Sequence, residues 1–137
     1  MTDEEKSEEA SIAAAIVVSE GRVLMVRRRV KEGKLSWQFP AGEVEQGESG
    51  SDAAVREAHE EVGIELSPVQ TLGQRVHPNT GRNMIYVACE LHPDQTATVV
   101  DTEELAELAW CDKALLKEHV PYPFFEPVQE YLDAKLS

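Results

Sequence analysis

Apolar residues recur along the chain with two different periods. Runs that are continuously apolar, or that alternate with polar residues between turn signals, predict β-strands. These runs cover residues 12–19 (IAAAIVVS), 22–29 (RVLMVRRR), a short segment within 36–42 (SWQFPAG) that ends at Pro40, 69–77 (VQTLGQRVH), 82–91 (RNMIYVACEL) and 107–111 (ELAWC). Glu20-Gly21 predicts a hairpin between the first two runs, and residues 78–81 (PNTG) predict a later turn.

Between Ser49 and Gly63 the apolar residues instead return at helical spacing. Ser49 or Ser51 suits the N-cap, because a hydroxyl can accept a bond from the first free N–H groups, and Gly63 suits the end of the helix. Residues 111–119 and 123–136 give two further helical patterns. Strands on both sides of a central helix, followed by C-terminal helices, predict an α/β fold whose mixed sheet is covered on both faces.

The chain of 137 residues has the length of one compact domain, which we expect over residues 11–137. The acidic residues 1–10 lack apolar periodicity, so we expect a disordered tail there. The 26 acidic side chains outnumber the 13 lysines and arginines, which gives a formal charge of -13. This balance disfavours a nucleic-acid polymer held through its phosphates.

No apolar run approaches the roughly 20 residues that span a bilayer, and the N-terminus lacks the pattern of a signal peptide. We therefore expect a cytoplasmic protein without a membrane partner, present as a monomer or small homo-oligomer. Cys89 and Cys111 lie far apart in strand-like segments without CxxC spacing. This placement favours buried, reduced thiols over a redox pair.

An acidic stripe follows one side of the central helix. At roughly 100° per residue, Glu57, Glu60 and Glu61 fall within a sector about 100° wide. The adjoining sector is apolar and should face the core; it contains Ala54, Val55, Ala58 and Val62. Like charges this close destabilise a helix unless a partner binds them.

Two kinds of partner can offset this repulsion. Arg56 is placed to pair with Glu60 at i,i+4, which would make the stripe an ordinary solvated face, but one arginine cannot neutralise three carboxylates. A divalent cation would turn the repulsion into affinity. Carboxylate oxygens suit Mg²⁺ or Mn²⁺, with the remaining ligands coming from water and substrate phosphate.

A longer constellation around this stripe resembles the signature motif of the Nudix hydrolases. The spacing matches at Gly42, Glu48, Arg56-Glu57, Glu60-Glu61, Gly63 and Ile64. So many specified residues at fixed spacing make a specific signal. Ala58 departs from the motif, which usually has a larger aliphatic residue there, and we expect an effect on packing more than on chemistry. The resemblance extends over about residues 12–134.

The resemblance implies an α/β/α sandwich that hydrolyses a nucleoside diphosphate linked to another moiety, with Mg²⁺ as cofactor and Mn²⁺ as a substitute. It further implies that the metal ligands are Gly42, through its carbonyl, and Glu57, Glu60 and Glu61. Arg56 and Glu48 would orient these glutamates. The chemistry is consistent with the residues present, because attack of water on phosphorus needs charge neutralisation and a positioned nucleophile.

The general base has several candidates. Related enzymes take it either from the motif or from a glutamate on a later loop. The segment before the last strand offers Glu103, Glu104 and Glu107, of which we choose Glu104 from its spacing to Trp110. Glu60 or Glu61 could serve instead, and the acidic segment is also compatible with a merely solvated loop.

Substrate contacts should lie outside the motif. Alternation along residues 22–29 sends Arg28 to one face and Arg27 and Arg29 to the other. By resemblance to the MutT-type branch, Arg28 would contact phosphate. Phe39, Tyr86 and Phe125 are candidates for the nucleotide pocket, with His77 as a further one, whereas we interpret Trp37 and Trp110 as mainly structural.

Phe125 separates this chain from the MutT enzymes that prefer oxidised guanine, in which an asparagine at the matching place hydrogen-bonds the purine. A phenyl ring can stack on a base but offers no donor or acceptor pair. We therefore expect a nucleoside triphosphate pyrophosphohydrolase acting on an ordinary or modified nucleotide, including pyrimidines. Two alternatives stay open: cleavage of ADP-ribose or another nucleoside diphosphate sugar, and a catalytically silent nucleotide-sensing domain.

Overall fold

The computed structural model describes residues 10–32 and 35–137; the expected acidic tail therefore lies almost entirely outside the described residues. Within the described ranges the chain forms seven strands and three helices. The strands are β1 (Ile12–Ser19), β2 (Arg22–Glu32), β3 (Leu35–Gln38), β4 (Ala41–Glu43), β5 (Leu66–Val76), β6 (Asn83–Leu91) and β7 (Leu105–Cys111). The helices are α2 (Gly50–Val62), α3 (Lys113–His119) and α4 (Glu126–Lys135).

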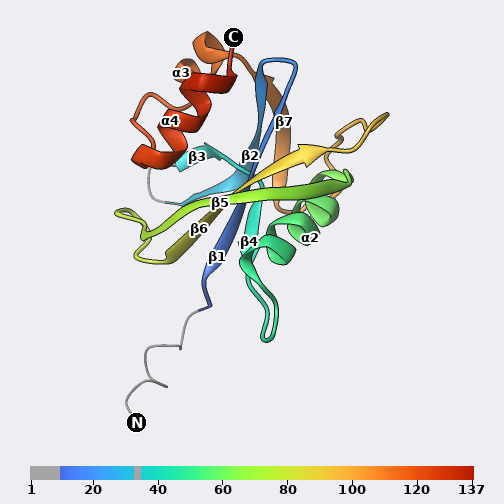
Figure 1. Cartoon of the computed structure of the whole chain (residues 1–137), viewed down its shortest axis with the longest axis vertical. Coiled ribbons are helices and arrows are strands. Elements are labelled where there is room, and N and C mark those ends of the chain that lie inside the picture. The colour runs from blue at the N-terminus through green and yellow to red at the C-terminus, as the bar shows by residue number, and fades with distance from the viewer. Residues whose placement is uncertain (1–9, 33–34) are drawn as a thin grey trace.

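The sheet is mixed, as expected. Its main path runs β3-β2-β1-β6-β5, while β4 pairs with β1 and β7 pairs with β2. The β1–β6 pair is parallel, and the other strand pairs are antiparallel. Helix α2 lies on one side of the strands and α3 and α4 lie on the other (Figure 1). This arrangement is the α/β/α sandwich that the resemblance implied.

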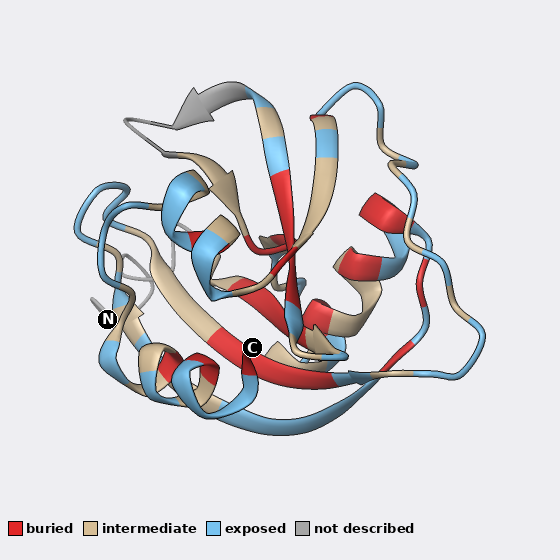
Figure 2. Ribbon diagram, turned by 90° about the horizontal axis from the view of Figure 1, so that it is seen from above, coloured by how far each residue is buried: buried red, intermediate tan, exposed pale blue. Residues whose placement is uncertain are grey.

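Strand β1 supplies both faces of the sheet with core residues, which explains its unbroken apolar sequence. Ala13, Ala15 and Val17 belong to the core cluster beneath α2. Ala14 and Ile16 belong to a second cluster, shared with Leu116 of α3 and with Val128 and Leu132 of α4. Buried positions follow the central strands and the sides of the helices that face them (Figure 2). A strand covered on both faces loses the polar alternation of a half-exposed one.

Several boundaries differ from those predicted. The segment 36–42 contains parts of two strands, because Phe39-Pro40 separates β3 from β4. Strand β5 begins before residue 69 and β7 before residue 107, and α4 begins later than residue 123. Pro127 lies in the first turn of α4, where the N–H that proline lacks would have no partner within the helix. The helix therefore begins at Glu126, and residues 123–125 precede it as a loop that lines the site.

The predicted hairpin is confirmed at Glu20 and Gly21, which both have positive φ angles of 53° and 77°. Two consecutive positive φ values match the right-handed twist of the strands that they join. No helix in residues 10–32 and 35–137 is long and apolar enough to cross a membrane.

Candidate active site

Helix α2 carries the acidic stripe, and its ends are fixed by local sequence. Ser49, one of the two predicted caps, accepts a hydrogen bond from the N–H of Asp52 at 3.0 Å. Gly63 ends the helix with a left-handed φ of 70°. Ala54 and Ala58 are fully buried between α2 and the sheet, and the small Ala58 side chain lets the helix pack closely against the strands. These features set the rotation of the helix and therefore the direction of its glutamates.

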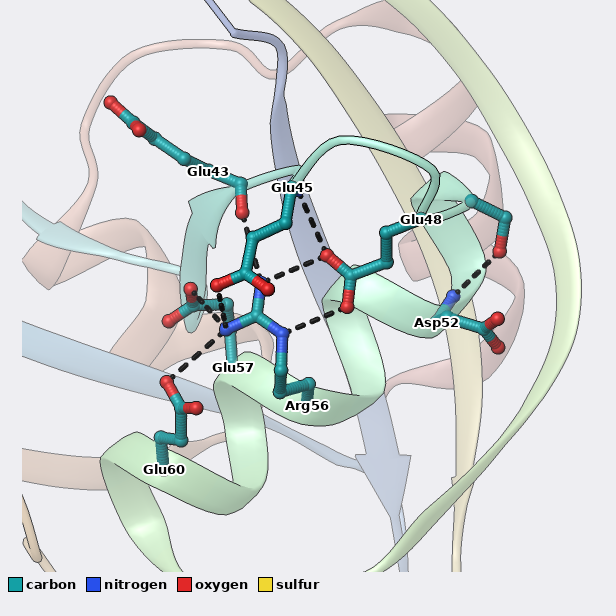
Figure 3. A network of polar contacts seen from close by, with 8 residues as sticks. Glu43, Glu45, Glu48, Asp52, Arg56, Glu57 and Glu60 are labelled. Carbon is teal, nitrogen blue, oxygen red and sulfur yellow. Dashed lines mark hydrogen bonds and ion pairs between the residues drawn. The ribbon is translucent and has the colours of Figure 1, made fainter.

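Arg56 lies at the centre of the acidic cluster, a name used here for Glu48, Arg56, Glu57, Glu60 and Glu61. Its guanidinium donates two hydrogen bonds to the Glu48 carboxylate, at 2.8 and 3.0 Å. Nη1 also reaches Glu57 at 3.0 Å and Glu60 at 3.2 Å (Figure 3). The bonds from Arg56 hold the pKa of Glu48 near 2, and they in turn raise the pKa of Arg56.

The loop before the helix is bound to the same guanidinium. Arg56 Nη2 donates to the backbone carbonyl of Glu43 at 3.0 Å, and the N–H of Glu45 donates to the Glu48 side chain at 3.0 Å. Arg56 and Glu48 therefore fix the segment that follows Gly42 against the helix. That they orient metal-binding glutamates stays a prediction.

Glu61 is buried, with 4% of its surface exposed. This corrects the expectation that it lies on a stripe beside the buried face, because Glu61 belongs to that face together with Ala58 and Val62. Burial raises the pKa of Glu61 to about 8, although the nearby Arg28 opposes the shift. Its Oε1 atom has no hydrogen-bond partner among the described residues. A positive charge that binds beside such a buried carboxylate stabilises its ionised form.

Arg28 faces Glu61 from strand β2. Its Nη2 lies 3.9 Å from a Glu61 oxygen, and its Nη1 lies 3.7 Å from a Glu104 oxygen. The neighbouring Arg27 points elsewhere and pairs with Glu107 of β7 at 3.1 Å. The β2–β7 register shifts between Arg27 and Arg28. Arg27 and Arg28 thus have partners in different places, which follows the predicted alternation. Arg28 lies between Glu61 of α2 and Glu104 of the loop before β7.

Gly42 lies against the Glu57 carboxylate so closely that a Cβ atom at this position would overlap it. Burial is the main reason that the pKa of Glu57 is raised, although Arg56 opposes the shift. A glycine is therefore needed here for the carboxylate and the backbone to approach one another. This contact brings together two of the groups that the resemblance assigns to metal binding.

The donor set fits a hard divalent cation. Glu57 and Glu61 are close enough that the charge of Glu57 contributes to the raised pKa of Glu61. Glu60, 57% exposed in its side chain, is turned toward Arg56. No three His, Cys, Asp or Glu side chains of the described residues already form a metal-binding group. Because Mg²⁺ commonly takes only one or two carboxylates, Glu57 and Glu61 suffice to begin a site, and Glu60 could join after leaving Arg56.

A cavity of about 1050 Å³ opens beside these groups. Arg28 and all members of the acidic cluster except Glu48 form part of its lining. Another part is aromatic and is called here the aromatic wall; it consists of Phe39, Tyr86, Phe124 and Phe125. Phe39 pairs with Phe124 at 5.4 Å between ring centroids, and Tyr86 pairs with Phe125 at 5.5 Å. The structure thus brings Phe39, Tyr86 and Phe125 to one cavity, and their contact with a nucleotide stays a prediction.

His77, a further candidate for the nucleotide pocket, and Trp37, interpreted from the sequence as structural, also lie at this cavity. His77 lines it, from the end of β5. Trp37, interpreted as structural, also lines the cavity while stacking on His119 at 4.1 Å. Trp110 packs against the core as expected.

Several lining residues had no place in the predicted site, and Arg75 and Asp101 are two of them. Arg75 of β5 lies over the Phe125 ring, with 5.1 Å from Cζ to the ring centroid, and its Nε has no hydrogen-bond partner among the described residues. Asp101 lines the cavity from the loop before β7. The one sequence signal for Arg75 was its place as a lone basic residue in the predicted strand 69–77. Its contact with Phe125 could not be predicted, because Phe125 lies in a distant part of the chain.

Comparisons with known proteins bear on the chemistry of this cavity. A family model described as the NUDIX domain matches residues 9–131. The CTP pyrophosphohydrolase of Escherichia coli (strain K12) is 32% identical over 113 residues, which cover 82% of this chain and 80% of that protein. An RNA pyrophosphohydrolase of Shewanella piezotolerans is 43% identical over 63 residues, 46% of this chain and 35% of that protein.

A solved structure of a NUDIX hydrolase from Nitrosomonas europaea has a similar fold. Its TM-score is 0.75 at 19% identity, and the match covers 92% of this chain and 71% of that one. At this level of identity the likeness concerns the fold alone.

Proposed function

The chain belongs to the NUDIX family and hydrolyses a phosphoric anhydride bond in a nucleoside diphosphate-linked substrate, and we propose that this substrate is a nucleoside triphosphate cleaved to the monophosphate and pyrophosphate. The observation that carries the proposal is that the buried carboxylate of Glu61, the half-buried carboxylate of Glu57 and the guanidinium of Arg28 line one cavity. This arrangement combines groups suited to a divalent cation with a cation suited to phosphate.

Family members use divalent cations, and we propose Mg²⁺ here, with Mn²⁺ as a substitute. Glu57, Glu61 and the Gly42 carbonyl would hold it, joined by Glu60. When bound, the cation neutralises pyrophosphate charge and makes water a better nucleophile. Arg56 and Glu48 keep the ligands oriented through the bonds described above.

The remaining steps fall to side chains of this protein. Arg28 would leave its long contacts with Glu61 and Glu104 and donate to a non-bridging phosphate oxygen, where a planar guanidinium can form two bonds. We assign Glu104 as the general base, which would accept the proton of the attacking water. Its carboxylate is 62% exposed in its side chain and is therefore accessible to water at the edge of the cavity.

The nucleoside would lie against the aromatic wall. Tyr86 and Phe125 offer ring faces for stacking, and Arg75 offers N–H donors beside them. The Arg75 Nε donor, which has no hydrogen-bond partner among the described residues, suits a base edge rich in acceptors, such as O2 and N3 of cytosine. The similarity to a CTP pyrophosphohydrolase points in the same direction.

A nucleoside diphosphate sugar is the second candidate, because the cavity is large for a single nucleotide. Pockets for small ligands usually measure about 300–1,000 Å³, and this one reaches about 1050 Å³. The Phe39–Phe124 pair adds a second aromatic surface on which another moiety could rest.

A substrate panel tests these assignments. Purified protein with Mg²⁺ would receive the ordinary and modified nucleoside triphosphates, ADP-ribose and nucleoside diphosphate sugars, with release of monophosphate and pyrophosphate measured. We expect the highest kcat/KM for a pyrimidine triphosphate. A preference for ADP-ribose would replace the first candidate by the second, and binding without turnover on any substrate would favour a sensor.

A further inference from the structure

Residues 102–104 form a turn at the rim of the cavity, and Glu104 is its last residue. The segment before the turn is attached to α2. The N–H groups of Val100 and Asp101 both donate to the backbone carbonyl of Glu61, at 2.9 and 3.2 Å. The start of the turn is therefore fixed to the residue that supplies the buried carboxylate.

The end of the turn is attached to β2 and to Asp101. The N–H of Arg29 donates to the Glu104 carbonyl at 2.9 Å, and the N–H of Glu104 donates to the Asp101 carboxylate at 3.2 Å. These bonds hold the backbone on both sides of Thr102 and Glu103. Within the turn, the N–H of Thr102 donates to the Val100 carbonyl at 3.0 Å, but this bond stays inside the segment and does not attach the turn to the rest of the fold.

Arg29 holds the middle of the turn through its side chain. Its Nε donates to the Thr102 carbonyl at 2.6 Å. Among the hydrogen bonds of the described residues, this is the only one from a side chain outside the segment 100–105 to the turn. Since the Glu104 side chain is largely exposed and its contact with Arg28 is long, at 3.7 Å, its position depends mainly on the backbone that carries it.

We propose that Arg29 is a positioning residue that holds the turn 102–104 so that the Glu104 carboxylate stays beside Arg28 and opposite Glu61. The inference rests on the proposed role of Glu104 in the hydrolysis. Arg29 itself lies outside the cavity lining, so we assign it no contact with substrate or metal. The three consecutive arginines thus have separate tasks: Arg27 pairs with Glu107, Arg28 faces the site, and Arg29 holds the loop.

Arg29→Ala tests the proposal, with Arg27→Ala as a matched control that removes the same charge two residues away. A displaced catalytic group can cost up to about a hundredfold in rate, so we expect Arg29→Ala to lower kcat by about ten- to a hundredfold with KM nearly unchanged. Arg29→Lys should recover part of the loss, because its ammonium can still donate to a carbonyl. Arg27→Ala should stay within about twofold of the wild-type protein.

A double variant separates positioning from a general loss of structure. If Arg29 acts through Glu104, Arg29→Ala should lower kcat no further in a Glu104→Gln background. An equal loss in both backgrounds would overturn the inference, as would an Arg29→Ala protein with wild-type kcat when Glu104→Gln is slow. A fully active Glu104→Gln protein would overturn the assignment of Glu104 and this inference with it, while leaving the hydrolase and its metal ligands in place.

Discussion

The acidic cluster and the aromatic wall border one cavity but are built in different ways. The acidic cluster comes from one helix and the loop before it, and Arg56 binds Glu48, Glu57 and Glu60 over sequence separations of one to eight residues. The aromatic wall comes from segments far apart in the chain, on β6 and beside β3 and α4. The acidic cluster is therefore set by local sequence, whereas the aromatic wall forms only when the whole chain has folded.

This difference predicts different kinetic effects of substitution in the two regions. We propose that the acidic cluster acts on the phosphates, which all nucleotides share, so its variants should lose activity on every substrate alike. We propose that the aromatic wall acts on the base, so its variants should change the order of substrates. An interaction made only in the transition state lowers kcat, and one made equally in the bound substrate alters KM.

Glu57→Gln should produce the largest effect. It keeps the shape of the side chain but removes a negative charge proposed to bind the cation, and we expect kcat/KM to fall by about a thousandfold on all substrates. Glu118→Gln, an exposed glutamate of α3 outside the cavity lining, is the control. Steady-state kinetics on several nucleotides would measure both variants. A loss confined to one nucleotide would contradict the division between the two regions.

Glu61 should make the stability of the metal-free protein depend on pH. Burial raises its pKa to about 8 in the folded protein from an ordinary value of 4.5, so the folded state holds the proton more tightly. The contribution of Glu61 to stability should thus be greatest below pH 4.5 and fall as pH rises through the window up to about 8, by an amount on the order of a few kcal/mol.

Glu61→Gln provides the comparison for this pH effect. Thermal unfolding in the presence of a chelator, followed from pH 5 to 9, should show the wild-type Tm falling relative to that of Glu61→Gln. Added Mg²⁺ should reduce the difference, because a cation stabilises the ionised carboxylate. Parallel curves for the two proteins would contradict the burial of this carboxylate in solution.

Arg75→Ala should produce a smaller and more selective effect. Loss of its donors beside Phe125 should raise KM about tenfold for a pyrimidine triphosphate, and less for nucleotides that do not use them, with kcat little changed. Arg22→Ala, an exposed arginine of β2, controls for the loss of charge. A uniform change in KM on all nucleotides would assign Arg75 to phosphate binding instead.

The acidic cluster could be predicted from the sequence because its geometry follows from helical spacing and from a motif of fixed length. Even there the depth of Glu61 was missed, since the tilt of α2 against the sheet depends on packing by residues such as Ala58 and Val87. The aromatic wall was predicted only as separate candidates. Arg75 was missed altogether, because its partner Phe125 lies 50 positions away and meets it only through the packing of α4 near β5.

Product analysis with and without metal tests the central claim most directly. The protein would be incubated with CTP and Mg²⁺, and the nucleotide and phosphate products would be separated and quantified before and after full chelation of divalent metal. We predict CMP and pyrophosphate in equal amounts, with no turnover after chelation. Release of CDP and phosphate, or turnover that survives complete chelation, would contradict the account.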